Sequence, residues 1–153
     1  MIFCLSILTY AQTPQDRATE LKKQAQSSLN QKDYIKARYL FKKAYEAFAS
    51  RENYPQAIEC GVQANALYVR ENFYKEGFEL CRDMEQLLWT GEQNKKKVFY
   101  DLRFLINKER LQMYTALKNP AQAKTQLDKL EEMANLAKND SLTEVLLYTK
   151  ANY

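Results

Sequence analysis

The chain has 153 residues, a formal net charge of +4, three glycines, three prolines and no histidine. This length fits one domain with a sizeable core. Interspersed acidic and basic residues are typical of a solvated helical surface rather than of a nucleic-acid footprint. The lack of histidine removes the commonest general base and metal ligand. The three glycines are too dispersed for a phosphate-binding loop.

Residues 1–11, MIFCLSILTYA, carry no charge and are mostly apolar. They are too few to span a bilayer, which takes about 20 residues in a helix. They resemble the apolar stretch of a secretory signal, with Thr9 and Ala11 as small residues before a cleavage point. We therefore expect residues 1–12 to be a signal-peptide remnant. The alternative is an apolar segment that lies over the first helical hairpin.

Three stretches, 34–48, 74–88 and 120–134, share a stripe of residues in steps of three and four. Such steps place side chains on one face of a helix, so the aromatic members are expected in the core rather than on a base-stacking surface. The second member of each stripe is small, which would let a neighbouring helix approach closely. The residues expected to pack the repeats together are Ala37, Gly77, Ala123, Tyr34, Phe41, Tyr68, Tyr74, Tyr114 and Leu127.

A further helical segment precedes each stripe, so each unit is expected to be two helices joined by a tight turn. Asn119 is a good N-cap with Pro120 at the first helical position, and Thr13 with Pro14 starts the first helix similarly. Helices are predicted over residues 14–31, 34–50, 54–70, 73–90, 93–117, 120–137 and 141–153.

Two features are expected to mark the links between these helices. Gly91 and the segment 139–141 interrupt the helical pattern. The basic run Lys95–Lys97 would then be the exposed start of the fifth helix. A contact with phosphate or anionic lipid is the alternative interpretation of that run.

These units resemble tetratricopeptide (TPR) repeats, most closely in DYIKARYLFKKAYEAF and more loosely in YKEGFELCRDMEQL and PAQAKTQLDKLEEM. The small residues are 40 positions apart (37 to 77) and then 46 (77 to 123), longer than the usual period of about 34. The resemblance implies an all-α fold, a right-handed superhelical stack of antiparallel helical hairpins with about three and a half repeats. It assigns residues 13–153 to the repeat domain. The helical pattern is still running at Tyr153, so we expect this domain to be truncated at its C-terminal end.

In this family the first helix of each hairpin lines a concave wall that binds peptides or protein segments. The wall positions implied by the resemblance are Lys22, Gln26, Asn30, Glu59, Val62, Arg70, Lys108, Gln112, Thr115 and Tyr148. For each of them, ordinary solvated surface is the competing interpretation. The family's carboxylate clamp would place Lys and then Asn on the first helix. Lys22 fits this pattern and Gln26 does not, so no such clamp is expected.

Cys60 and Cys81 stand at equal distances from the predicted turn at residues 70–72. Two antiparallel helices joined there would bring the two cysteines to the same height. In an exported protein a disulfide across the second hairpin is one interpretation. The other is a pair of small apolar side chains buried separately in the core.

The residues contain no nucleophile–base pair and no metal-ligand set, so we expect no catalysis, no cofactor and no metal. The resemblance implies a non-catalytic module whose partner is a protein or peptide segment, not nucleic acid, and which meets a membrane only through a region outside these residues. With an export signal, it is similar to the periplasmic N-terminal sensory regions of membrane-bound bacterial regulators, including sensor histidine kinases. The alternatives are a periplasmic or lipid-anchored scaffold of an envelope complex, a docking arm for a downstream enzyme, and, without export, a cytoplasmic protein.

Overall fold

The computed structural model describes residues 14–153, and the side chains from residue 17 onward. The expected signal remnant at residues 1–12 and the start at Thr13 lie outside the described residues. Within them the protein is all-α, as predicted, and has no strand. The helices are α1 (Pro14–Asn30), α2 (Tyr34–Ala49), α3 (Tyr54–Arg70), α4 (Tyr74–Lys95), α5 (Tyr100–Ala116), α6 (Pro120–Ala137) and α7 (Asp140–Ala151).

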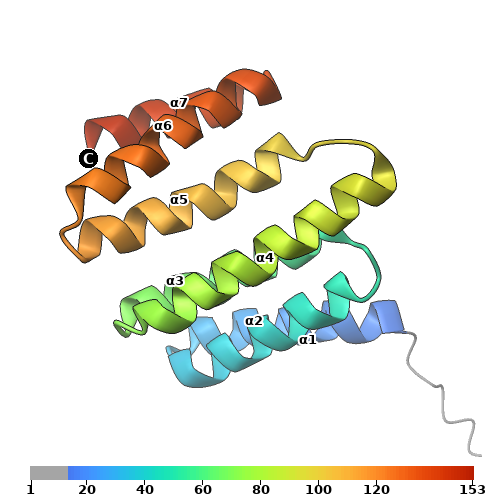
Figure 1. The fold of residues 1–153 in the computed structure, drawn as a ribbon. Coiled ribbons are helices and arrows are strands. Elements are labelled where there is room, and N and C mark those ends of the chain that lie inside the picture. The colour runs from blue at the N-terminus through green and yellow to red at the C-terminus, as the bar shows by residue number, and fades with distance from the viewer. Residues whose placement is uncertain (1–13) are drawn as a thin grey trace, which may run out of the picture.

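The helices stack in chain order, and the chain reverses its direction at every turn (Figure 1). Each helix packs against the next one, and α3 also packs against α5. The α1–α2 hairpin lies at one end of the molecule, and α6 and α7 lie at the other (Figure 1). The α1–α2 hairpin is therefore separated from α6 and α7 by the helices that lie between them (Figure 1).

Four of the turns close in the same way, as the turn between α1 and α2 illustrates. The N–H of Lys32 donates to the carbonyl of Leu29, and the N–H of Asp33 donates to the carbonyl of Ser28, both at 2.9 Å. These two bonds form a Schellman motif. Asp33 also caps α2, because its carboxylate accepts the N–H of Lys36 at 3.2 Å. The same backbone bonds recur at Glu52 with Asn53, Asn72 with Phe73, and Lys118 with Asn119.

The left-handed position at the end of six helices is never a glycine in the described chain. It is occupied by Lys32, Glu52, Asn72, Lys96, Lys118 and Lys138. The glycines instead lie inside helices, where two helices meet closely. A Cβ atom on Gly77 of α4 would lie 2.7 Å from the sulfur of Met113 in α5 and 3.0 Å from the amide oxygen of Asn65 in α3. The missing side chain therefore sets the spacing of three helices.

The buried side chains form two clusters that share α5. Leu102, Ile106 and Met113 of α5 belong to the cluster built by α1 to α4. Phe104 and Leu111, on the other side of α5, belong to the cluster built with α6 and α7. Among the residues expected to pack the repeats, Ala37, Gly77, Ala123 and Phe41 are buried, and Tyr34, Tyr68, Tyr74, Tyr114 and Leu127 are half-buried against a core cluster.

The predicted link between the fourth and fifth helices is wrong. α4 continues through Gly91 to Lys95, and α5 begins only at Tyr100. Gly91 does not interrupt the helix; it makes room for the ring of Tyr54, because a Cβ atom there would lie 2.5 Å from Cζ of that ring. The basic run Lys95–Lys97 therefore ends α4 and does not start α5. Positive side chains at the C-terminal end of a helix are stabilising, because this end of the helix dipole is negative.

A buried carboxylate holds this longer link together. Glu92, near the end of α4, accepts the backbone N–H of Phe99 at 2.9 Å and the Nε–H of Arg103 at 2.7 Å. Burial favours a higher pKa for Glu92, but the bonds from Arg103 and Phe99 outweigh it, so its pKa lies below the usual value. Phe99 is the N-cap of α5 and has no capping side chain of its own. Glu92 thus fixes the first turn of α5 to the end of α4 through the N–H of Phe99 and the side chain of Arg103.

The contact between Gly91 and Tyr54 predicts the effect of adding one methyl group. Gly91→Ala should cost about 1–3 kcal/mol in packing, because the Tyr54 ring is buried and packs against Phe99. This cost should exceed the gain of about 1 kcal/mol in helix propensity, so the net free energy of unfolding should fall. Urea denaturation followed by circular dichroism would measure it. In a Tyr54→Leu background the same substitution should cost less. An equally stable or more stable Gly91→Ala single variant would contradict the assigned contact.

Candidate functional site

A groove lies between α5 and α7. Its volume is about 450 Å³, within the range of small ligand sites. We call it the α5–α7 groove. It is lined by Lys108, Leu111, Gln112, Thr115 and Ala116 of α5 and by Tyr148, Thr149, Asn152 and Tyr153 at the C-terminal end of the chain.

The groove combines an apolar base with polar groups at its rim. Leu111 forms part of the base and is buried, whereas Tyr148 is 74% exposed. Lys108 is the one charged residue among those that line the groove. The side chains of Thr149 and Asn152 donate to carbonyls of α7 itself, at 2.7 Å each. Lys108 and Gln112 therefore offer the polar contacts, and the arrangement suits an apolar side chain next to a carboxylate.

The groove brings together four of the wall residues expected from the resemblance, namely Lys108, Gln112, Thr115 and Tyr148. They come from two helices that are not consecutive in the chain. Tyr153 closes one end, where its hydroxyl donates to the carbonyl of Pro120 at 3.2 Å.

The other expected wall residues contact one another or the rest of the chain. Lys22 of α1 pairs with Glu59 of α3 at 2.7 Å and donates to Gln56 at 2.9 Å. These contacts join the first helices of two successive hairpins. The amide of Gln26 donates to Asn30 at 3.1 Å. The guanidinium of Arg70 lies 4.0 Å from the centre of the Tyr34 ring, and Val62 is half-buried against the core.

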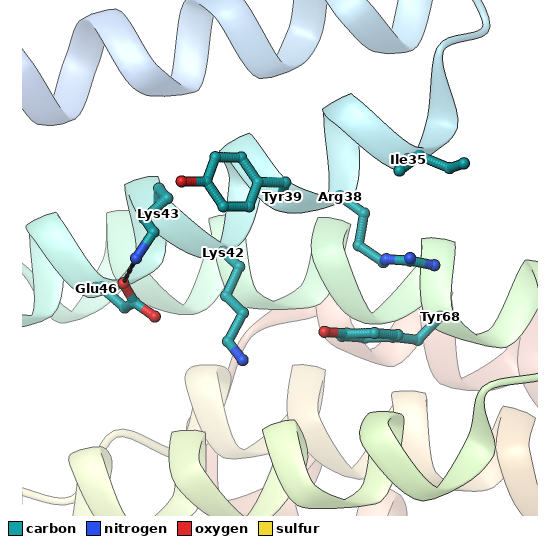
Figure 2. A pocket seen from close by; sticks show the side chains of 7 residues that line it. All are labelled: Ile35, Arg38, Tyr39, Lys42, Lys43, Glu46 and Tyr68. Carbon is teal, nitrogen blue, oxygen red and sulfur yellow. Dashed lines mark hydrogen bonds and ion pairs between the residues drawn. The ribbon is translucent and has the colours of Figure 1, made fainter.

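The sequence interpretation missed a surface on α2, which Figure 2 shows. Its hollow has a volume of about 390 Å³ and is lined by Ile35, Arg38, Tyr39, Lys42, Lys43, Glu46 and Tyr68. Ile35 and Tyr39 are 69% and 61% exposed. The sequence does carry a signal, since these two large apolar residues stand four positions apart and off the buried stripe of α2.

A polar pair is buried where α3 and α5 meet. The side-chain amide of Asn65 donates to the carboxylate of Glu109 at 2.9 Å, and both residues are buried. The amide oxygen of Asn65 has no partner. Burial raises the pKa of Glu109, and the opposing effects of the Asn65 hydrogen bond and of Lys108 are smaller. Burial in the core therefore disfavours the charged form of the Glu109 carboxyl group.

Cys60 and Cys81 are free thiols in the structure, one in α3 and one in α4. Both are fully buried. Burial raises the pKa of each thiol to about 12, so both stay protonated and are poor nucleophiles at neutral pH. This environment is that of two small apolar side chains in the core.

Two further properties bear on function. Residues 14–153 contain no group of three or more cysteine and acidic side chains placed to hold a metal ion. None of the described helices has both the length and the apolar character needed to cross a bilayer.

No family model, curated protein or solved structure matches this chain. The contacts of the described residues are therefore the basis for any functional inference.

The buried Asn65–Glu109 pair predicts a pH-dependent stability. The raised pKa of Glu109 means that its carboxyl group holds a proton more tightly in the folded state than in the unfolded state. The free energy of unfolding therefore falls as the pH rises from the ordinary carboxyl pKa of about 4.3 through the raised pKa. Glu109→Gln removes this charge and can donate to the unpartnered amide oxygen of a reoriented Asn65. At pH 7 it should be more stable than the wild type by about 1 kcal/mol. Urea unfolding at a series of pH values would measure this.

The exposed Glu132 provides the matched control for that series. The stability difference between Glu109→Gln and the wild type should shrink as pH falls, whereas that of Glu132→Gln should stay near zero throughout. A destabilised Glu109→Gln at pH 7 would show that the carboxylate is stabilising as an ion.

Proposed function

We propose that this chain is a TPR-like α-solenoid, a right-handed superhelical stack of hairpins that binds a protein or peptide segment and does not catalyse a reaction. The antiparallel packing of helices in chain order supports the proposal. So do the four turns with identical backbone bonds and the buried small residues at matching positions of α2, α4 and α6.

The α5–α7 groove carries the proposal. Under the repeat interpretation α5 and α7 are first helices of successive hairpins, and the groove joins Lys108, Gln112 and Tyr148 from the two. Exposed aromatic side chains are common anchors of binding energy at interfaces. An extended peptide could place one apolar side chain over Leu111 and Tyr148 and one carboxylate near Lys108. This is a binding chemistry that needs no cofactor.

A random-peptide library selected on the purified protein would test the groove. Selected peptides should bind Tyr148→Ala about tenfold more weakly than the wild type, because the substitution removes the exposed aromatic wall. Lys108→Ala should lower the affinity chiefly of those peptides that carry a carboxylate. Fluorescence anisotropy with labelled peptides would give the affinities.

Trp89→Ala is the matched control, since Trp89 is also a largely exposed aromatic residue but does not line the groove. It should leave the affinities unchanged. Peptides that bind Tyr148→Ala as tightly as the wild type would contradict the groove as the binding site.

In the wider protein we propose that this module is the N-terminal, extracytoplasmic sensory part of a membrane-bound bacterial signalling regulator. A periplasmic or lipid-anchored scaffold of an envelope complex is the second candidate. It is favoured by the hollow on α2 that Ile35 and Tyr39 line, because a scaffold needs a contact surface besides the α5–α7 groove.

Both versions depend on export, which the apolar residues 1–12 support. Residues 1–20 fused to a reporter enzyme that is active only outside the cytoplasm should give activity. A fusion that accumulates inactive in the cytoplasm would favour a cytoplasmic TPR-like protein instead. A fusion that lacks residues 1–12 controls for leakage.

A further inference from the structure

The exposed side of α2 carries two adjoining hollows. The first, of about 390 Å³, is bounded by Ile35, Tyr39 and Lys42 of α2 together with Tyr68 of α3 (Figure 2). The second, of about 360 Å³, lies further along α2 and extends to Arg17 and Leu21 of α1. Lys43 and Glu46 line both hollows. We call the two together the α2 surface.

The charge of the α2 surface is strongly one-sided. Its cations are Arg17, Arg38, Lys42, Lys43 and Arg51, and its one carboxylate is Glu46. Glu46 is already paired with Lys43 at 3.0 Å. Lys42, in the middle of the row, has no carboxylate partner among the described residues. Glu71, beside the first hollow, pairs with Arg38. Five cations and two carboxylates therefore meet at this surface, which is net positive although the whole chain is only mildly basic.

Arg38 is held in place before any partner arrives. Its guanidinium pairs with Glu71 and lies 4.9 Å from the centre of the Tyr68 ring and 5.1 Å from that of Phe73. In Figure 2 the side chain extends from α2 over Tyr68. A guanidinium that is already stacked loses little side-chain entropy on binding.

Exposed apolar groups stand next to these cations. Ile35 and Tyr39 are successive members of one row of α2, and the ammonium of Lys43 lies 5.8 Å from the centre of the Tyr39 ring. Aromatic and arginine side chains are enriched at protein interfaces, where large apolar groups provide most of the binding energy. The surface therefore offers both an apolar anchor and a charge that selects a partner.

We propose that the α2 surface is a docking site for an acidic segment of another protein, one that carries clustered carboxylates and a large apolar or aromatic side chain. The carboxylates would lie along Lys42 and the neighbouring arginines, and the apolar side chain would pack on Ile35 and Tyr39. Positions 35 to 49 of α2 span about 21 Å at the rise of an α-helix, which is enough for several residues of a bound segment.

Two other occupants fit the surface less well. A second copy of this chain placed on α2 by twofold symmetry would bring cations against cations, which costs free energy. A lipid surface supplies negative charge, but it has no side chains to fill two hollows of this size. Charge complementarity and the hollows together favour a protein segment.

The test uses a synthetic helical peptide with a row of glutamates around one tryptophan, and an analogue in which lysines replace the glutamates. The wild-type protein should bind the acidic peptide, more weakly as salt rises, and should not bind the lysine analogue. Tyr39→Ala and Lys42→Glu should each lower the affinity for the acidic peptide about tenfold. Both side chains are exposed, so the fold should be retained, which circular dichroism would check.

Lys124→Glu is the matched control for charge, because it makes the same change in net charge on an exposed position of α6. It should leave the affinity within about twofold of the wild type. Tyr148→Ala, in the α5–α7 groove, should also leave it unchanged. If Lys124→Glu weakens the peptide as much as Lys42→Glu does, the attraction is general and the proposal fails.

Three further results would overturn the proposal. The first is stronger binding to phosphatidylserine vesicles or to a DNA duplex than to the acidic peptide, if Lys42→Glu abolishes it. The second is a dimer in solution that Tyr39→Ala dissociates. The third is binding of the acidic peptide only after deletion of residues 1–13, which would make those residues the occupant.

Discussion

The packing of the helices depends on three glycines, at which the absence of a side chain lets another helix come close. Gly61 and Gly77 let the sulfurs of Met84 and Met113 lie against the backbone of another helix, and Gly91 does the same for the Tyr54 ring. Protein interiors are packed densely enough that a methyl group at such a place must move something. The contact of Gly77 with Met113 sets how closely α5 approaches α4. It therefore also sets where α5 presents its wall of the α5–α7 groove.

Local patterns predicted the helices well wherever the cause of a boundary was local. Asn119 accepts the N–H of Gln122 as an N-cap, and α6 spans the predicted residues 120–137. The link after α4 was wrong because the reason for Gly91 lies in another helix. A glycine that marks a turn and one that faces an aromatic ring have the same letter in a sequence. Likewise, no turn in residues 14–153 has glycine at its left-handed position, so glycine was a poor guide to the ends of these helices.

The candidate sites were predictable to different degrees. The resemblance assigned Lys108 and Tyr148 to the first helices of two successive hairpins, and both line the α5–α7 groove; that they bind a ligand stays a prediction. The same reasoning assigned Lys22 and Glu59 to the expected wall, but it did not show that these two side chains form an ion pair with each other. Ile35 and Tyr39 were missed because the search for a core follows the buried stripe of a helix. The Asn65–Glu109 contact joins residues 44 positions apart, and no short-range pattern connects them.

The shared position of α5 makes the two walls of the groove unequal. α5 contributes to both buried clusters, so we expect its amide hydrogens to exchange with solvent more slowly than those of α7. α7 has two buried residues, Leu142 and Leu146, and an ion pair from Lys150 to Glu131 of α6, so we expect it to detach at a smaller free-energy cost than α5. We therefore expect the groove to have one fixed wall, α5, and one wall that can move, α7. A ligand would spend part of its binding free energy on holding α7 closed, so substitutions that tighten α7 could raise affinity without touching the ligand.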